Sequence, residues 1–477
     1  MTDTRTQVLA VPWQSTQPMP VTRPRRKTRQ ALIADLLGIL ALGSLVLTTW
    51  IWVRSGGYLQ TFVYPEYAIG SQALLTGLLS SNLMVLQVFF LARIPWVEQS
   101  WGHDVLARRH RQVGYWSFWL MIAHVVLFAI ERTEEPRGDV FGALWALFVT
   151  DPWMIWATLG TLMLIVVVVT SIRWARKRLR YESWHLLHLY SYLGMGLAFP
   201  HQVFDGTHFH ELWTQIFFWG LYLSALAAVL VFRLGVPLWR SWYHRLRVTQ
   251  VHQEVPGVVT VSMRGRHLDR MGTRSGQFFV WRFLDGPGWS RGKPYTISAP
   301  PRPRSLEVTI AAVGESSARA ATLRPGTSVL IEGPYGTMTA ERRTRPRMVL
   351  FAAGVGITPF RGILQDSQYA PGEAALVYRY TDDEHAIFRD ELVELARQRG
   401  IDLYLLPGRR RGDGSWLPDT VLDVAGTDDY VLERMVPDIA DRDAFICGPS
   451  PWIRSVRRSL KAVGMPERNV HHEDFAW

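Results

Sequence analysis

The sequence predicts a multi-domain membrane protein, with a six-helix transmembrane bundle followed by an antiparallel β-barrel and an α/β domain. Three observations lead to this fold class. Apolar runs of about 20 residues, long enough to cross a bilayer as helices, are concentrated in the first half of the chain. Short alternating segments broken by Gly and Pro begin at about Trp242. Strand–turn–helix patterns then begin at about Arg347.

The composition agrees with this division. The chain has 477 residues, which is enough for about three domains of roughly 150 residues each. Only 19% of the residues are charged, whereas soluble domains have about 25%, so a wholly soluble protein is disfavoured. The 48% of hydrophobic residues excludes a disordered chain. The single cysteine excludes a disulfide framework within the chain and any multi-cysteine zinc or iron–sulfur site.

Six apolar runs are expected to span the membrane. They are Ala31–Val53, Gly70–Ile94, Val113–Ile130, Trp153–Ile172, Trp184–Phe204 and Leu212–Leu234. The fifth run has the weakest apolar pattern because it carries His185, His188 and His201. Polar residues inside a span are costly, so these histidines are functional candidates.

The basic residues follow one side of the predicted bundle. The net charge is +11, and Lys and Arg cluster in the leading tail, in the second–third and fourth–fifth loops, and after the sixth span. The positive-inside rule then places both termini and the second half of the chain in the cytoplasm. This distribution favours the lipid bilayer, and not a nucleic acid, as the partner of the basic residues. Residues 1–30 are expected to form a flexible tail without a cleaved signal peptide, because no apolar core closely follows their charges.

Four histidines have a regular spacing on two of the predicted spans. His110 and His124 are 14 residues apart on the third span, and His188 and His201 are 13 apart on the fifth. At 1.5 Å per residue each separation is about 20 Å, so each helix offers one histidine near each membrane face. Two such helices side by side would hold two haems with bis-histidine ligation, because neutral imidazole is a good iron ligand.

The helical geometry supports one span better than the other. Fourteen residues return to within about 40° of the starting direction, whereas thirteen fall about 140° away on a straight helix. The fifth span is therefore expected to depart from ideality, and Pro200 is one candidate cause. His185 is an alternative to His188 at the inner level. The alternative for His110, which lies in a basic cluster, is an interfacial residue, and the alternative for His201 is the first residue of an outer loop.

The segment Lys293-Pro-Tyr295-Thr296 resembles the Arg-x-Tyr-Ser/Thr motif of the ferredoxin–NADP reductase family. The resemblance implies that Tyr295 packs on a flavin, that Thr296 meets its N5 edge and that Lys293 meets the pyrophosphate. Lysine keeps the charge of the family's arginine but loses its bidentate fork, and Arg291 is an alternative.

A second segment of the barrel region also resembles this family. It is Gly314-Glu315-Ser316-Ser317, and the resemblance implies that Gly314, Ser316 and Ser317 hold phosphate through backbone groups and hydroxyls.

The segment Gly354-Val-Gly356-Ile-Thr358-Pro359 follows a predicted strand and opens a predicted helix. Glycines at such a turn let backbone N–H groups approach a pyrophosphate, and a helix N-terminus favours an anion. An ordinary tight turn is the alternative. The position of this segment in the chain, after the flavin motif, favours a nucleotide site.

Two C-terminal motifs complete the resemblance. Cys447-Gly448-Pro449 is similar to the family's nicotinamide site, where the cysteine lies beside the hydride path; a buried structural cysteine is the alternative. The end of the chain, Glu473-Asp-Phe475-Ala-Trp477, is similar to the family's terminal Glu-x-aromatic. This similarity implies that Phe475 covers the flavin and that Glu473 lies near the hydride path, with Trp477 as a competitor for the covering role.

Arg379 is a candidate ligand for the 2′-phosphate of NADPH, as is the run Arg409–Arg411. A solvated basic face is the alternative for these residues.

From about Ala31 to Trp477, the ordered combination of motifs resembles the NADPH oxidase and ferric reductase family. The resemblance implies an inner haem on His110 and His188 and an outer haem on His124 and His201. It also implies a haem domain at 31–236, an FAD-binding barrel at 237–341 and an NAD(P)-binding α/β domain at 342–477. The expected cofactors are FAD, two b-type haems and NADPH, with NADH as the alternative.

The function implied by this resemblance is electron transfer across the membrane. Electrons would pass from cytoplasmic NADPH through FAD and the haems to an extracytoplasmic acceptor, either dioxygen or a ferric complex. The alternatives are a donor subunit that passes electrons to a partner protein or quinone, and a haem-free scaffold or sensor.

Overall fold

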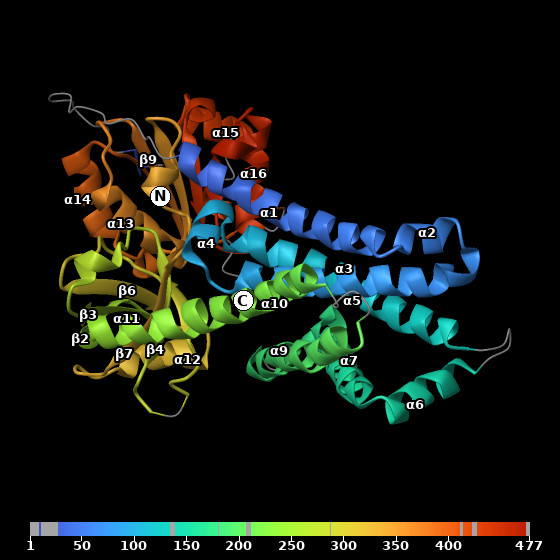
Figure 1. The fold of residues 1–477 in the computed structure, drawn as a ribbon. Helices are drawn as coiled ribbons and strands as arrows, with labels where there is room; N and C mark the ends of the chain where they lie inside the picture. Colours follow the sequence, from blue (N-terminus) through green and yellow to red (C-terminus); the bar gives the residue numbers. More distant parts are fainter. Residues whose placement is uncertain are drawn as a thin grey trace. The chain divides into compact units, whose positions relative to one another are not determined.

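The computed structural model describes residues 9–10, 27–133, 139–179, 181–206, 211–286, 288–410, 414–421 and 427–473. Phe475 and Trp477, the two candidates for covering the flavin, lie outside these residues. The chain divides into a helical unit, Leu32–Leu234, and a second unit formed by Met1–Ala31 and Gly235–Trp477. Figure 1 shows long helices in the first unit, and sheets with shorter helices in the second.

Five helices in the described part of the chain are long and apolar enough to cross a membrane. These segments are Ala31–Arg54, Pro65–Leu91, Val105–Glu131, Pro152–Ser171 and Leu212–His244. The principal helices within them are α1 (Lys27–Arg54), α3 (Ala68–Leu91), α5 (His103–Glu131), α7 (Pro152–Ser171) and α10 (Leu212–Ala228). The expected fifth span forms a helix, α9 (Tyr181–Phe204), which contains Pro200 but is not among these five. The membrane-helical region is thus confirmed, whereas the count of six spans stays a prediction.

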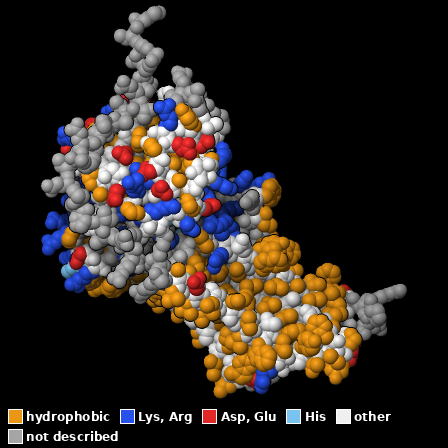
Figure 2. All heavy atoms as spheres, turned by 90° about the horizontal axis from the view of Figure 1, so that it is seen from above, with side chains coloured by type: hydrophobic (Ala, Val, Ile, Leu, Met, Phe, Trp, Pro, Cys, Tyr) orange, Lys and Arg blue, Asp and Glu red, His pale blue; other side chains and the backbone are white. Residues whose placement is uncertain are grey.

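Shorter helices complete the first half of the chain. They are α2 (Gly57–Phe62), α4 (Pro95–Trp101), α6 (Val140–Thr150) and α8 (Arg173–Arg176). Figure 2 shows hydrophobic side chains covering most of the helical region on the face in view, while Lys, Arg, Asp and Glu gather on the rest. Large apolar side chains such as Leu36, Trp145 and Leu212 are exposed there, as expected of a surface that faces lipid.

The helices pack in close pairs, α3 with α5 and α7 with α9. Gly160 on α7 and Gly194 on α9 make the second contact possible. A Cβ atom on Gly160 would lie 2.5 Å from the Gly194 carbonyl oxygen. Small residues allow helix backbones to approach closely in a membrane, where lipid supplies no hydrophobic force between helices.

Two three-stranded antiparallel sheets follow the last span. One contains β2 (Arg247–Val255), β3 (Val258–Arg264) and β6 (Ser305–Ala311) in that order, and the other β5 (Lys293–Thr296), β4 (Phe278–Phe283) and β7 (Val329–Tyr335). Residues of both sheets share one core, and single bridges connect the sheets at Arg247–Ser328 and Ile297–Val308. The antiparallel strands are confirmed, and closure into a barrel stays a prediction. Helix α11 (Val236–His244) packs on β7, and α12 (Glu315–Ala318) follows β6.

The C-terminal part is a six-stranded sheet in the order β1-β10-β9-β8-β11-β12. Its strands are β1 (Leu9–Ala10), β10 (Asp402–Pro407), β9 (Ala374–Tyr380), β8 (Met348–Ala353), β11 (Asp443–Cys447) and β12 (Val470–His472), and all pairs except β1–β10 are parallel. Helices α13 (Thr358–Asp366) and α14 (Arg389–Arg399) contribute to the core on one side of this sheet. Helices α15 (Asp428–Met435) and α16 (Ser450–Ala462) contribute to the other core. The predicted α/β architecture of this part is confirmed, and the common carboxyl edge of its parallel strands is where ligands bind in such sheets.

Candidate functional site

The structure brings the four candidate histidines together in two pairs within the helical unit. The rings of His110 on α5 and His188 on α9 have centroids 5.9 Å apart. The centroids of His124 and His201, on the same two helices, are 6.4 Å apart. A bond of about 2 Å from each histidine to a shared metal would separate the ring centroids by roughly 6 Å. Both pairs therefore have a spacing that fits one iron between two imidazoles.

The Nδ1 atoms of all four histidines lie next to protein oxygens. His110 and His124 donate to the carbonyls of Gln87 (3.2 Å) and Ala73 (2.7 Å), which both belong to α3. His201 contacts the carbonyl of Ala198, and His188 lies 3.3 Å from the Ser171 hydroxyl.

Such contacts fix the tautomer and the orientation of a metal-binding histidine, and leave Nε2 for the metal. The residues that supply these oxygens belong to no sequence motif, so the contacts could not be predicted from the sequence. His185, the alternative inner residue, has a ring contact with its neighbour Trp184.

In the second unit, β5 directs the flavin-motif side chains. Lys293 and Tyr295 alternate with Pro294 along the strand, so they lie on one face and line a cavity of about 260 Å³. Thr296 ends the strand and is buried. Burial raises the pKa of the Tyr295 phenol to about 12, so this ring remains neutral at physiological pH.

Several basic and aromatic residues that the motif does not contain also line this cavity. They include Trp281, Trp289, Arg291 and Arg319. Asp285 holds Arg319 in an ion pair of 3.0 Å. The structure thus places Arg291, the alternative to Lys293, at the same cavity, and adds Arg319, which sequence reasoning missed.

The candidate phosphate loop is a tight turn at the start of α12. The Ser317 hydroxyl accepts hydrogen bonds from the backbone N–H groups of Val313 and Gly314, both at 3.0 Å. Gly314 has open space around it, and Ser316 lies within α12. Gly314 and Ser317 do not line the cavity that contains Lys293 and Tyr295.

The glycine motif forms the turn from β8 into α13, at the carboxyl edge of the parallel sheet. Gly354 has a φ of 55°, a conformation that favours glycine. A Cβ on Gly356 would lie 2.2 Å from the Cys447 carbonyl oxygen, so only glycine fits there. Thr358 donates to the Val355 carbonyl at 3.0 Å, and Pro359 occupies the first turn of α13, where no N–H is needed.

The second nicotinamide motif lies beside this turn. Cys447 is buried, and Gly448 packs against Trp452 and Ala353, while Pro449 precedes the first residue of α16. Burial and then the charge of Glu473 raise the pKa of the Cys447 thiol to about 12. The thiol is therefore protonated, and the Glu473 carboxylate lies within electrostatic range of it.

Glu473 reaches this place from the end of β12. Its Oε1 accepts hydrogen bonds from the backbone N–H groups of Thr337 and Met338, the latter at 3.2 Å. Both donors follow β7 in the antiparallel part of the unit. The structure therefore brings Cys447, Glu473 and the glycine turn together, whereas sequence alone gave no indication of Thr337.

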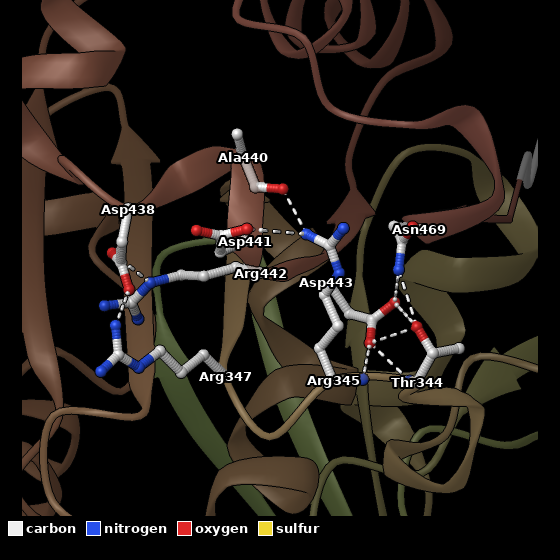
Figure 3. A network of polar contacts seen from close by, with 9 residues as sticks. All are labelled: Thr344, Arg345, Arg347, Asp438, Ala440, Asp441, Arg442, Asp443 and Asn469. Carbon is white, nitrogen blue, oxygen red and sulfur yellow. Dashed lines mark hydrogen bonds and ion pairs between the residues drawn. The ribbon is translucent and has the colours of Figure 1, made fainter.

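A buried carboxylate fixes β12 in position. Asp443, at the start of β11, accepts hydrogen bonds from Asn469 (2.9 Å) and the backbone N–H groups of Thr344 and Arg345 (Figure 3). It also accepts one from His471 (3.2 Å). Burial alone would raise the pKa of Asp443, but the hydrogen bonds from His471, Asn469 and the backbone outweigh it and lower the pKa to about 2. This ionised group ties β11 to the strand that carries Glu473.

Arg379 lies at the carboxyl end of β9, in register with Ala353 at the end of β8. Its guanidinium donates to the Gly408 carbonyl at 3.2 Å. Burial and the nearby charge of Arg410 lower the pKa of Arg379, but an arginine remains charged at physiological pH. Two cations therefore gather at the edge that contains the glycine turn.

Comparisons with known proteins agree with this division of the chain. Residues 76–199 match the family described as "ferric reductase like transmembrane component", and residues 350–458 match "oxidoreductase NAD-binding domain". The two matches support an NAD(P)H-dependent oxidoreductase. More particularly, the chain contains one segment similar to a ferric-reductase-like transmembrane component and one similar to an oxidoreductase NAD-binding domain.

Curated relatives match part of the chain. The glycine betaine monooxygenase reductase subunit of Chromohalobacter salexigens is 28% identical over 50% of this chain and 65% of its own length. The ferredoxin reductase component of 3-ketosteroid-9-alpha-monooxygenase from Rhodococcus rhodochrous is 28% identical over 43% and 57%, respectively. This chain thus spans less than two thirds of the length of either relative.

Among solved structures, the flavohaem-like FAD/NAD-binding domain of nitric oxide dioxygenase from Vibrio cholerae is 20% identical. The alignment covers 48% of this chain and 98% of that one, with a TM-score of 0.40.

Proposed function

We propose that the protein carries electrons across a membrane, from cytoplasmic NADPH through FAD and two b-type haems to dioxygen or a ferric complex on the opposite side. One observation carries the proposal: the same two helices carry two histidine pairs, and in each pair the distance between ring centroids leaves room for one iron ion. The Nδ1 atoms of these histidines lie next to protein oxygens, which leaves Nε2 for the metal. Bis-histidine ligation leaves no open iron position, so an acceptor would take electrons at the haem edge.

The membrane arrangement is part of the same proposal. The charge pattern of the loops supports six spans with both termini and the flavin-binding half in the cytoplasm. The proposed domains are a tail at 1–30, a haem domain at 31–236, an FAD-binding barrel at 237–341 and an NAD(P)-binding domain at 342–477.

The cofactors supply the redox chemistry, since a flavin accepts a hydride from a nicotinamide and releases single electrons, which haem iron can carry. The chain's residues bind and orient them. Lys293 binds the flavin pyrophosphate, and Tyr295 and Thr296 position its ring. Gly314, Ser316 and Ser317 add backbone and hydroxyl donors for phosphate, and Phe475 or Trp477 covers the ring.

The carboxyl edge of the parallel sheet is the proposed nicotinamide site. The turn through Gly354, Gly356, Thr358 and Pro359 offers backbone N–H groups to the pyrophosphate. Cys447, with Gly448 and Pro449, forms the wall beside the hydride path. Glu473 is tied to the loop after β7, so its carboxylate stays next to the Cys447 thiol.

NADPH is proposed as the preferred donor because of the cations at this edge. Arg379 and Arg410 lie next to the strand end that precedes the glycine turn. A guanidinium binds a phosphate through two parallel hydrogen bonds. NADPH carries such a phosphate at its 2′ position, whereas NADH has only a hydroxyl there.

A second candidate is a donor that passes electrons to a partner protein. The curated relatives favour it, because their names describe reductase subunits or components of monooxygenases. The two candidates share the flavin and nicotinamide sites and differ in the acceptor.

The deciding experiment is NADPH-driven reduction of cytochrome c by the purified protein loaded with FAD and haem, in air, with and without superoxide dismutase. Strong inhibition by the dismutase is the expected result and identifies dioxygen as the acceptor. Activity that resists the dismutase, or that requires a ferric chelate, identifies either a metal reductase or a donor that passes electrons directly to a protein. No activity with either acceptor, in a protein whose flavin is reduced by NADPH, supports the donor role.

A further inference from the structure

One cation lies inside the apolar run that forms the last span of the helical unit. Arg233 is the only charged residue between Leu212 and Leu234. It belongs to the segment Val229–Gly235, which forms a π-helix between α10 and α11. Charged residues inside membrane helices are costly and mark functional positions, and π-helical turns frequently occur at such positions.

The guanidinium points towards the end of α3. Its Nη1 atom donates to the Leu91 carbonyl at 3.1 Å. Leu91 follows Gln87 by one helical turn, and the Gln87 carbonyl accepts the Nδ1–H of His110. Carbonyls four residues apart lie on the same face of a helix, about 6 Å apart along its axis. Arg233 is therefore anchored one turn from the oxygen that orients His110.

Two further helices place Arg233 on the same side as the His110–His188 pair. Its charge acts on His103 of α5 and on Tyr192 of α9. His103 precedes His110 by two turns, and Tyr192 follows His188 by about one, so each lies close to the face that carries its histidine. Arg233 is thus within electrostatic range of both helices that carry the histidine pair.

Arg93, in the same region, is a buried cation that is paired with a carboxylate. Arg93 forms an ion pair of 2.9 Å with Glu98, and both side chains are almost fully buried. In the described part of the chain, by contrast, no carboxylate pairs with Arg233, and its hydrogen bond is to a backbone carbonyl. A cation in a low-dielectric region is stabilised by an anion brought to it, and a guanidinium matches the planar geometry of a carboxylate.

We propose that Arg233 binds a propionate carboxylate of the haem held by His110 and His188. A haem carries two such carboxylates on one edge, so this contact would fix its rotation within the site and keep a positive charge beside it. The inference rests on the proposed function, because it requires a haem at the inner pair. Arg233 would be specific for that haem, since the His124–His201 pair lies about 20 Å further along the helices.

The test is a redox titration of the full-length, haem-loaded protein, followed by the absorbance of the haem α-band. We compare the wild type, Arg233→Gln, Arg233→Lys and the control Arg132→Gln, an exposed arginine at the end of α5. Removing a cation beside a haem disfavours the added electron. Arg233→Gln should therefore lower the midpoint potential of one haem, or lose that haem, while the other remains unchanged. Arg233→Lys should retain the haem with a smaller shift, and the control should match the wild type.

The haem concerned is identified in single-haem backgrounds. The shift should persist with His124→Leu and disappear with His110→Leu. Two unchanged potentials with full haem content in both Arg233 variants, or an equal shift of both haems, would overturn the proposal. A wild-type protein without two haem steps would instead overturn the proposed function, so the two failures are distinguishable.

Discussion

At the scale of single residues, the chemistry of the nicotinamide edge depends on groups that are buried next to one another. Cys447, at the end of β11, is the clearest case, because its carbonyl group adjoins the glycine turn and its thiol is within electrostatic range of Glu473. Burial and the carboxylate both oppose the thiolate. The residue can therefore border a reacting nicotinamide without itself becoming a nucleophile.

We predict that Cys447 in the folded protein resists iodoacetamide at pH 8. With a pKa of about 12, only about one thiol in 10⁴ is ionised at that pH, and the sulfur is buried. Mass spectrometry of the intact protein should show no adduct before unfolding and one adduct afterwards, because the chain has one cysteine. Cys447→Ser provides the blank. Rapid modification of the folded protein would show that the thiol is exposed or activated.

The second residue-scale prediction concerns Asp443. Its folded-state pKa of about 2 lies below the unfolded value of about 3.9, so its contribution to stability is complete above about pH 4 and is lost as the pH falls through about 2. Asp443→Asn should thus lower the stability of the flavin-binding unit by on the order of 2 kcal/mol at pH 7, and by less at lower pH. The temperature of flavin release, followed by fluorescence at pH 7 and at about pH 3, where a large part of the contribution is lost, measures this difference.

Asp441→Asn is the matched control, because Asp441 precedes Asp443 by two positions in the sequence and its side chain is 85% exposed (Figure 3). Its release temperature should equal that of the wild type. An equal loss in both variants would mean that the buried hydrogen bonds of Asp443 are not the cause.

The residues that could be located from the sequence are those within short motifs. The turn through Gly354 and Gly356 was located because its members are adjacent in the chain. Anchors such as Asp443 and Thr337 were missed, because their partners lie far away in sequence: Glu473 reaches Thr337 across 136 positions. Contacts of this kind are created by folding and leave no local pattern.

At the scale of elements, predictions succeeded where a strand or helix has a continuous apolar pattern. Strands β8, β9 and β11 are buried on both faces, so their sequences are nearly continuous apolar runs. Helix α9 is less apolar because of its histidines, and its position depends on the close contact of Gly194 with Gly160 of α7. The π-helical turn around Arg233 could not be predicted. A π-helix has one more residue in each hydrogen-bonded turn than an α-helix, and the apolar pattern of the sequence is the same for both.

The element-scale prediction concerns the turn between β8 and α13. Gly356→Ala would place a methyl group 2.2 Å from the Cys447 carbonyl oxygen, so the turn or β11 must move. We expect KM for NADPH to rise about 10-fold or more, since a displacement of about 1 Å at a binding turn has effects of this size. Steady-state kinetics with a soluble acceptor such as ferricyanide, together with the bound FAD content, measure the effect.

The FAD content should stay near the wild-type level, because the flavin motif lies on β5 in the antiparallel part of the unit. Gly220→Ala is the control, since nothing lies within 4 Å of the added methyl group. An unchanged KM in Gly356→Ala would show that the nucleotide does not approach this turn.

At the scale of the whole molecule, the chain joins a helical unit to a unit that matches an oxidoreductase NAD-binding domain and carries the proposed FAD and NAD(P)H sites. Each unit has its own cores, so a defect in one is expected to leave the other folded. In the proposed conduit, electrons pass from one unit to the other. A defect in the helical unit should therefore stop the steps after flavin reduction and leave flavin reduction itself intact. Variants of the histidines can therefore separate flavin reduction from transfer beyond it.

The whole-molecule prediction uses His124, which the structure pairs with His201. His124→Leu should lose about half of the haem, or retain it and block outward transfer, because one of the two proposed bis-histidine sites loses a ligand. Reduction of the flavin by NADPH should continue, since the nucleotide edge lies in the other unit. Haem is measured by the pyridine haemochrome assay, flavin reduction by anaerobic stopped-flow absorbance, and outward transfer by cytochrome c reduction.

His252→Leu, on β2 of the flavin-binding unit, is the control and should behave as the wild type. Wild-type haem content together with wild-type outward transfer in His124→Leu would reject the assignment, whereas loss of flavin reduction would mean that the two units do not fold independently.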